Sequence, residues 1–352
     1  MSDASQAGFP LPLTTFEKYM LLDDRPDYPM TFILQLRFSG RIDRPAFQAA
    51  FVAALARHPL LCAVIEGTSI EDSSWRFAHG LEPPLDWNTA GVALECPGGE
   101  GIDLSREPGL RAWVREGEQI EMTFQFHHAC CDGIGAMRFV GDVLATYAAA
   151  VAPPDCRPKL RPVEVSELGR RWQLAVKCPE AISRAREVWT MLREASRWVL
   201  QSPTPLHPPR RDKPLDPAAS PFPRITSCTL DPQRTESLRK TALRHEVTLN
   251  DLLLCEMFVT LCQWNDRQQP GKAGRWLRIN MPTSLRDRSH DRMPAANLMS
   301  YAFLTRRPGA CGDPEELLRR IGRETSAIRR WNLGHFFTNG VRFALRFPPV
   351  MR

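Results

Sequence analysis

Residues 201–224 form the segment that most limits how this chain can fold, because the run QSPTPLHPPRRDKPLDPAASPFPR is dense in proline. Proline has no backbone N–H and a fixed φ, so such a run excludes a regular helix or a sheet ladder. The 352 residues suffice for two medium domains on either side of it. We predict an N-terminal lobe over residues 1–165, a helical segment and proline-rich crossover over 166–224, and a C-terminal lobe over 225–352.

The composition is that of an ordinary soluble globular protein, with 43% hydrophobic and 24% charged residues. No apolar run reaches the roughly 18 residues of a membrane span, and the N-terminus lacks the pattern of a secretory signal. The ten cysteines contain no CxxC pair, so we expect reduced thiols in a cytoplasmic protein. The net charge of +6 suits an anionic ligand, such as a phosphorylated cofactor or an acidic carrier protein, and nothing indicates nucleic-acid binding.

Periodicity predicts a mixed order of strands and helices. In the N-terminal part, alternation predicts strands in TFILQLRFSG, LLCAVIEG, GLRAWVREG and QIEMTFQFHH, and helical spacing predicts helices in DRPAFQAAFVAALARHP and GAMRFVGDVLATYAAAVA. In the C-terminal part we expect two helices within residues 230–265, strands within 274–286 and 297–307, and an amphipathic helix over 313–331. The order is not a regular βαβ alternation, so the fold class is mixed α/β.

Residues Val163 to Leu200 have a helical pattern with many arginines and tryptophans. Trp172, Trp189 and Trp198 line one apolar face of the expected helix. Such a stripe usually packs on the body of a protein. The alternative is a surface helix that makes peripheral contact with a membrane, because basic residues flank the apolar ones.

Two adjacent histidines, His127 and His128, end the strand predicted in QIEMTFQFHH. Side chains alternate along a strand, so the two rings point in opposite directions and have different roles. His128 shares its face with apolar residues, which favours the neutral, proton-accepting form of the ring. Asp132 stands where it can cap the helix that follows, and Gly133 permits a positive φ or a close backbone approach.

The same residues admit other readings. The histidines can be ordinary packing residues, with Asp132 as a helix cap. His128 and Asp132 are four residues apart, but no further His, Cys or Asp stands at a recognisable ligand spacing for a metal. Cys130 or Cys131 beside a histidine would be a thiol nucleophile, although adjacent residues rarely orient as nucleophile and base and buried cysteine is usually inert.

The longer pattern HHACCDG resembles the HHxxxDG signature of the condensation-domain and chloramphenicol-acetyltransferase-like acyltransferase superfamily. FSGRIDRPAFQAAFVAALARHPLL resembles that family's N-terminal strand, helix and RHPLL segment, and DLSREPGLRAWV its short strand before the signature. VTLNDLLLCEMFVTLCQW resembles its TxND helix, and INMPTSLRDRSHDRMPAANLMS the segment with an arginine and then Gly-Asn. The resemblance covers most of the chain in the family's order.

The resemblance implies two similar α/β lobes with a channel between them and a site in mid-channel. It implies transfer of an acyl group from a CoA or carrier-protein thioester to a hydroxyl or amine, with acyl-CoA or a phosphopantetheinyl carrier as donor substrate and no permanently bound cofactor or metal. His128 matches the general base of that reaction, and His127 matches the supporting histidine.

Four further residues match the family's site. Asp132 matches an aspartate that is mainly structural and pairs with an arginine, and Arg286 matches that arginine. We therefore expect an ion pair between Asp132 and Arg286 across the two lobes. Gly133 matches the glycine whose small size keeps the channel open, and Asn297 stands at the Gly-Asn position, where Ala296 replaces the glycine.

Three function classes follow from the resemblance: a stand-alone acyltransferase, a condensation-type enzyme that joins two carrier-bound substrates as an amide, and a non-catalytic binding member of the fold. The chain ends at RFALRFPPVMR without the DFGWG-like motif and the further strands that relatives carry. We therefore expect an incomplete second lobe with an exposed strand edge beside NLMSYAFL, where Leu298, Tyr301 and Phe303 lack obvious partners.

Overall fold

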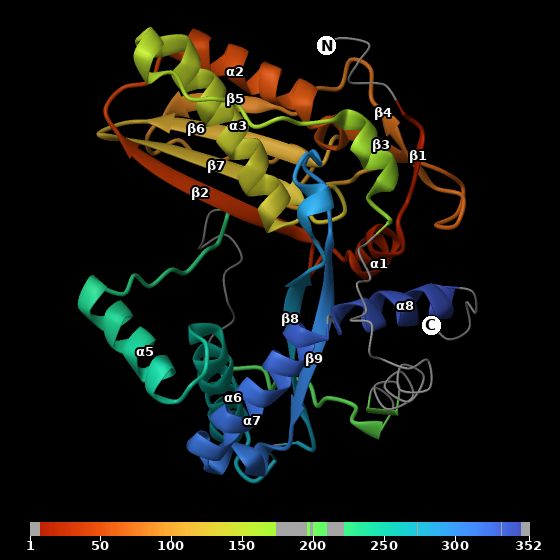
Figure 1. Cartoon of the computed structure of the whole chain (residues 1–352), viewed down its shortest axis with the longest axis vertical. Helices are drawn as coiled ribbons and strands as arrows, with labels where there is room; N and C mark the ends of the chain where they lie inside the picture. Colours follow the sequence, from red (N-terminus) through yellow and green to blue (C-terminus); the bar gives the residue numbers. More distant parts are fainter. Residues whose placement is uncertain are drawn as a thin grey trace. The chain divides into compact units, whose positions relative to one another are not determined.

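The computed structural model describes residues 8–173, 196–197, 200–209, 222–272, 274–331 and 333–345. The chain divides into two compact units (Figure 1). Unit 1 comprises residues 1–175, 220–225 and 286–299, and unit 2 comprises residues 176–219, 226–285 and 300–352. This division differs from the three consecutive segments expected from the sequence, because residues 286–299 leave the C-terminal part of the chain and pack as part of unit 1.

Unit 1 is built on a four-stranded sheet with the strand order β2-β7-β6-β5. Its strands are β2 (Thr31–Ser39), β5 (Leu85–Thr89), β6 (Leu110–Glu116) and β7 (Gln119–His127). β7 pairs antiparallel with β2 and β6, and β5 runs parallel to β6. The predicted strands at residues 31–40, 109–117 and 119–128 are confirmed.

A smaller sheet with the order β1-β4-β3 lies beside it in unit 1. Its strands are β1 (Leu11–Pro12), β3 (Ala63–Glu66) and β4 (Ser74–Phe77). Helix α1 (Thr15–Asp23) runs from β1 toward β2 and begins with a capping box formed by Thr14 and Glu17.

Helices α2 (Arg44–Arg57) and α3 (Gly133–Val151) lie side by side on one face of the four-stranded sheet (Figure 1). Asp43 caps α2 by accepting a hydrogen bond from the backbone of Ala46. Phe139 of α3 sits at the centre of the core, with its ring centroid 6.1 to 6.4 Å from those of Phe124 and Phe126. Of the described helices, only α3 is long and apolar enough to cross a membrane by length and composition, and 33% of that stretch is buried.

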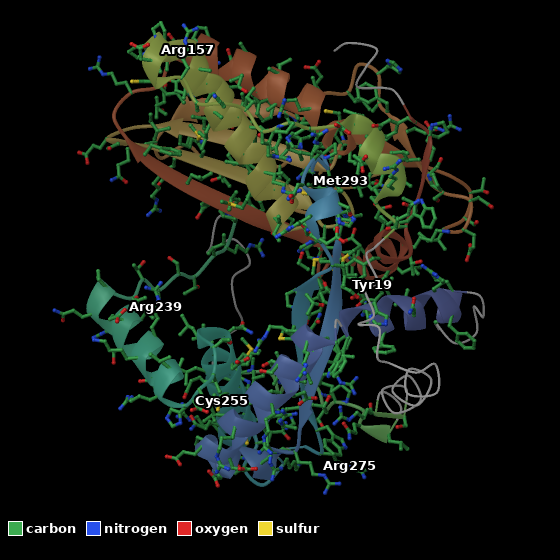
Figure 2. The ribbon with its side chains drawn as sticks, in the orientation of Figure 1. Tyr19, Arg157, Arg239, Cys255, Arg275 and Met293 are labelled. Carbon is green, nitrogen blue, oxygen red and sulfur yellow. The ribbon has the colours of Figure 1, made fainter. Side chains whose placement is uncertain are left out.

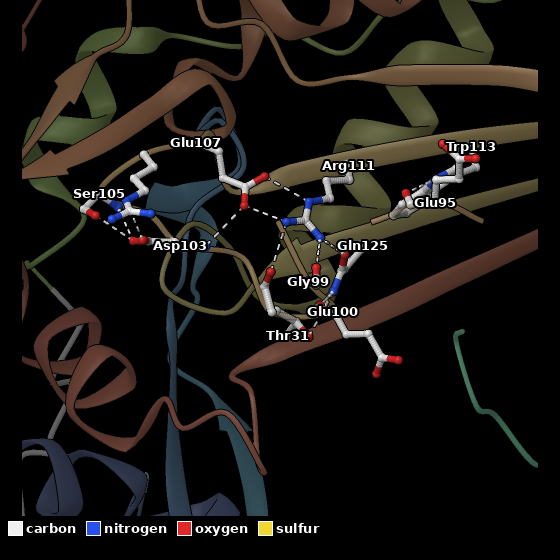
Figure 3. Close-up of polar contacts among 12 residues, drawn as sticks. Thr31, Glu95, Gly99, Glu100, Asp103, Ser105, Glu107, Arg111, Trp113 and Gln125 are labelled. Carbon is white, nitrogen blue, oxygen red and sulfur yellow. Dashed lines mark hydrogen bonds and ion pairs between the residues drawn. The ribbon is translucent and has the colours of Figure 1, made fainter. Parts of the chain in front are cut away.

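The opposite face of the sheet holds an irregular loop by side-chain hydrogen bonds from β6 (Figure 3). Arg115 donates to the carbonyl groups of Val92 and Ala93, and Trp113 donates to that of Glu95. Arg111 donates to the carbonyl groups of Gly99 and Gly101 and forms an ion pair with Glu107. Alternate residues of one strand thereby satisfy the backbone of a loop that has no ladder of its own.

Unit 2 contains α5 (Pro232–Arg244), α6 (Leu249–Gln268), β8 (Leu277–Ser284), α7 (Pro314–Arg330) and α8 (Gly334–Leu345), and β8 pairs with β9 (Met299–Arg306). These elements confirm the two helices, two strands and amphipathic helix predicted there. Their core includes Phe258, Leu304 and Ile321, all fully buried, and Cys255 of α6, which is labelled in Figure 2.

The expectation that Leu298, Tyr301 and Phe303 lack partners is wrong. Leu298 is fully buried in unit 1. The rings of Tyr301 and Phe303 lie 5.7 and 5.1 Å from the ring of Phe337 on α8, a helix that we did not predict. Within the described residues, β8 and β9 form a two-stranded sheet. The channel expected between the lobes stays a prediction.

The helix expected from Val163 to Leu200 falls largely outside the described residues, as do Trp189 and Trp198. Its described beginning is a 3-10 helix, Val165–Arg170. Arg171 then forms a fully buried ion pair with Glu17, at 2.7 Å, while Trp172 is exposed. A buried arginine beside α1 explains why this part of the segment packs on unit 1.

Candidate active site

The two histidines occupy the end of β7, where the chain turns toward α3. The backbone N–H of His128 donates to the carbonyl of Met30 at 2.7 Å. Asn297 donates from its side-chain amide to the carbonyl of His128 at 2.6 Å. The main chain of His128 is therefore fixed by two hydrogen bonds. Its N–H is bound by the residue before β2, and its carbonyl is bound by a side chain of the segment 286–299.

The ring of His128 packs at a tilt against Phe32 of β2, with 4.4 Å between ring centroids, and Phe32 stacks in turn on Phe126. Burial lowers the pKa of His128 to about 4, with a smaller contribution from His127, while the negative charge of Asp132 opposes the shift. Its Nδ1 atom is buried, and an interaction with the backbone of Cys131 adds a further small opposition to the shift. His128 is therefore neutral at pH 7, as its place on an apolar face predicts.

The ring of His127 lies in a different environment, as alternation along the strand predicts. Its Nδ1 accepts a hydrogen bond from the backbone of Ala129 at 3.0 Å, so the ring proton resides on Nε2. That Nε2 faces a carboxylate oxygen of Asp24 at 3.4 Å. Burial raises the pKa of Asp24, but hydrogen bonds from His127 and Met30 outweigh this effect and hold the pKa below its usual value.

Asp132 is the hub that joins the turn, the helix and the segment 286–299. One carboxylate oxygen accepts from the backbone of Gly135 at 2.8 Å, which caps α3. The other accepts from the backbone of Leu298 at 3.0 Å and from the guanidinium of Arg286, which also donates to the carbonyl of Ala296. Both partners of the ion pair are buried, so their charges are held in a fixed geometry.

The predicted contact between Asp132 and Arg286 is confirmed. The expectation that it crosses the two lobes is wrong, because both residues belong to unit 1. Arg286 follows β8 closely in the sequence, which suggested the second lobe, but its segment is bound by unit 1 over most of its length.

Gly133 does not adopt a positive φ, so that part of its predicted role is wrong. A Cβ atom at Gly133 would meet nothing within 4 Å, and the described chain therefore does not require glycine there. The close approach occurs at Gly135 instead, where a Cβ would lie 3.0 Å from the carbonyl oxygen of Ala296. Open space beside Gly133 is compatible with its predicted role of leaving room for substrate, which stays a prediction.

A buried cluster that we did not predict anchors the segment 286–299. His58 is fully buried; its Nδ1 accepts from the backbone of Ala295 at 2.7 Å, and its Nε2 lies 3.1 Å from Asp142 of α3. Burial lowers the pKa of His58, which keeps Nδ1 free to accept. Arg161 donates to the carbonyl of Met293, a fully buried residue labelled in Figure 2.

Asp24 and His58 each had a weak sequence signal. His58 belongs to the RHPLL segment, which carries part of the family resemblance. Asp24 precedes β2 by a short turn, and β2 begins opposite His127, because Thr31 and His127 are paired in register. A residue shortly before Thr31 is therefore placed near the histidine pair once that register is known.

The two other chemical readings of the motif receive no support. Cys130 and Cys131 are fully buried, and burial raises the pKa of both thiols well above the usual value, so the thiolate form is strongly disfavoured. Among the described residues, no group of three or more His, Cys, Asp or Glu side chains is arranged to hold a metal ion. Within the described part of the motif, the geometry therefore leaves a neutral histidine whose main chain is fixed.

Comparisons with known proteins place this geometry in a fold. No protein-family model matches the chain. It is 25% identical to Rv2305, an uncharacterized protein of Mycobacterium tuberculosis strain H37Rv, over 331 residues that cover 91% of this chain and 72% of that protein. It also resembles the first condensation domain of the calcium-dependent antibiotic synthetase in complex with a substrate analogue, with a TM-score of 0.65, 16% identity and coverage of 92% and 76% of the two chains.

A second solved structure, the complex of the X-domain and OxyB from teicoplanin biosynthesis, matches with a TM-score of 0.58 and 18% identity over 95% of this chain and 73% of that chain. The predicted mixed α/β class is thereby confirmed. The chain has the chloramphenicol-acetyltransferase-like fold of the condensation domains and their structural relatives.

Proposed function

We propose that this protein transfers an acyl group from a phosphopantetheinyl thioester to an amine or hydroxyl, with His128 as general base. The condensation-type reaction on carrier-bound substrates is the form that we favour, because the likeness in fold is to condensation domains. A CoA thioester presents the same phosphopantetheinyl arm and is the second candidate donor. The net charge of +6 suits either polyanionic donor.

One observation carries the proposal: His128 is neutral at pH 7 and its main chain is fixed on both sides. A positioned neutral imidazole accepts the proton of the attacking amine or hydroxyl while the new bond to the thioester carbonyl forms. With a pKa of about 4, it is too weak a base to take the proton beforehand, so proton transfer accompanies the attack. The tetrahedral intermediate then expels the thiolate, which receives the proton from His128.

No covalent enzyme intermediate is needed, because a thioester is already activated toward nucleophiles. The remaining residues hold the base in place. Asp132 caps α3, and its ion pair with Arg286 ties the turn after His128 to the segment 286–299. Asn297, from the same segment, donates to the carbonyl of His128. His127 supports the turn through the backbone of Ala129.

The test is acyl transfer by His128→Ala, measured as thiol release and product formation with acyl-CoA and acyl-carrier thioesters in parallel. We expect a loss of about 100-fold or more, the usual effect of removing a general base. His79→Ala is the matched control, because His79 is an exposed histidine of unit 1, and it should retain full activity. Near-normal turnover by His128→Ala would refute the mechanism.

A non-catalytic binding role is the second candidate, because one structure of this fold is an X-domain in complex with another protein. The same assay separates the two. Binding of a carrier protein without release of thiol from any thioester would favour the binding role. A preference for the carrier-bound over the CoA-bound donor would favour the condensation-type reaction.

A further inference from the structure

Asp24 is connected to the histidine pair in two ways. One carboxylate oxygen accepts the backbone N–H of Met30 at 2.7 Å. The other faces Nε2 of His127 at 3.4 Å. Asp24 follows the last residue of α1, and the turn between it and Met30 is closed by backbone hydrogen bonds between Arg25 and Tyr28.

The contact with Met30 links Asp24 to the second histidine. The carbonyl of Met30 accepts the backbone N–H of His128 at 2.7 Å. Asp24 therefore contacts the ring of His127 directly, and it binds the N–H of Met30, the residue whose carbonyl accepts from the main chain of His128. Among the described residues, no other side chain makes both connections.

The contact with Asp24 also stabilises one tautomer of His127. Because Nδ1 of His127 accepts from the backbone of Ala129, Nε2 carries the proton and needs an acceptor. Asp24 supplies that acceptor from a half-buried position. The nearby charged groups do not replace it: Arg25 pairs with Asp23, and Asp103 is a second carboxylate, whose pKa is raised slightly by the charge of Asp24 but is lowered overall by Ser105.

Arg111 and Gln125 hold the loop that lies next to the turn between Asp24 and Met30, and Figure 3 shows the contacts of these two side chains. Arg111 binds the carbonyl groups of Gly99 and Gly101, and a Cβ atom at Gly101 would lie 3.9 Å from the side chain of Pro29. Gln125 donates to the carbonyl of Glu100 and to the hydroxyl of Thr31. The Asp24–Met30 turn is thereby backed by a loop that is itself fixed to β6 and β7.

We propose that Asp24 is a positioning residue for the histidine pair: it fixes the Nε2–H tautomer of His127 and, through Met30, the main chain of His128. This inference rests on the proposed function only for its effect on turnover. The tautomer of the His127 ring can be measured without any substrate.

The first experiment is Asp24→Asn with kcat and KM measured separately. Asparagine is isosteric but offers one acceptor in place of two, so it cannot accept from both Met30 and His127. We expect kcat to fall by about 10- to 100-fold, as for other small misplacements of a catalytic group, with KM within about threefold. Asp23→Asn, whose partners are Arg25 and Tyr19, is the matched control and should keep kcat within about twofold.

The double variant Asp24→Asn with His127→Gln separates positioning from general destabilisation. If Asp24 acts through His127, the double variant should lose little more activity than His127→Gln alone, because each change removes the same contact between Asp24 and His127. Losses in kcat that multiply in full would show that Asp24 does not act through His127, and would overturn the claim that it positions that ring.

Nitrogen-15 NMR of the histidine rings decides the structural part. The folded wild-type protein should show His127 with its proton on Nε2, and Asp24→Asn should reduce that tautomer's share while Asp23→Asn leaves it unchanged. A wild-type His127 protonated on Nδ1 refutes the proposal even if Asp24→Asn does not fold. If wild type transfers no acyl group from any thioester, the proposed function fails, while the NMR result on Asp24 still stands or falls by itself.

Discussion

Replacing Asp132 with alanine should be among the most destabilising single substitutions in unit 1. The carboxylate caps α3 through Gly135, accepts the backbone of Leu298 and pairs with Arg286. In the variant, Arg286 stays buried but loses the carboxylate that balances its charge. Removing one partner of a buried ion pair costs about 3–5 kcal/mol, and losing a helix cap costs about 1 kcal/mol. We expect a total of about 4–6 kcal/mol, which approaches the whole stability of a typical domain.

Asp43→Ala provides the matched control. Asp43 caps α2 by the same kind of hydrogen bond, to Ala46 at 2.8 Å, but it is exposed and forms no ion pair with any described residue. It should lose only about 1 kcal/mol. The difference between the two variants, about 3–5 kcal/mol, then measures what the contacts of Asp132 with Arg286 and Leu298 add to its capping role.

Equilibrium urea unfolding followed by tryptophan fluorescence measures both variants, because Trp75, Trp87 and Trp113 are all buried in unit 1. Equal shifts of the unfolding midpoint in Asp132→Ala and Asp43→Ala would refute the reasoning. The double variant Asp132→Ala with Arg286→Met should recover much of the loss, since it no longer buries an unbalanced charge. A double variant as unstable as Asp132→Ala would show that the cost lies elsewhere.

Two further predictions concern stability. Because burial holds the pKa of His128 at about 4, below 6.5 in the unfolded chain, only the unfolded chain binds this proton between those values. The free energy of unfolding should therefore fall by about 3 kcal/mol from this group as the pH falls from about 6.5 to 4. In urea titrations at several pH values, His128→Phe should lose less stability over this pH range than the wild type. An equal loss in both proteins would contradict the pKa assigned to His128. Gly109→Ala would place a Cβ 1.8 Å from the sulfur of Cys130 and should cost about 1–3 kcal/mol in thermal or urea unfolding, whereas Gly141→Ala, with nothing within 4 Å, should be neutral or stabilising.

Local patterns sufficed for the strand-turn-helix that carries the motif. Alternation along residues 119–128 predicted β7, and Asp132 was predicted as a cap from its place before an apolar helical run. The apolar surroundings of His128, and hence the direction of its pKa shift, also followed from alternation. The contact of Asp132 with Arg286 could be predicted only from the resemblance, because 154 residues separate them and no periodicity reaches that far.

The residues that the sequence did not reveal are placed by tertiary pairing. Asp24 reaches His127 only because β2 pairs with β7 in one particular register. Arg111, Trp113 and Arg115 lie on the same face of β6, and two charged residues on one face of a strand usually indicate that this face is exposed to solvent. Both arginines are instead buried beneath a loop whose carbonyl groups they bind. Polar side chains that satisfy a distant backbone have no local signature, so the sequence offered no reason to separate them from exposed ones.

The membership of residues 286–299 in unit 1 has a consequence during synthesis on the ribosome. When His128 and Asp132 emerge, the groups that will hold them, Arg286 and Asn297, have not yet been translated. At about 5–20 residues per second, the 154 residues between Asp132 and Arg286 take about 8–30 s to make. Until then Asp132, at the start of α3, lacks Arg286 as its partner, and unit 1 lacks residues 286–299. A chaperone that shields this turn would act in that interval, before the last part of unit 1 leaves the exit tunnel.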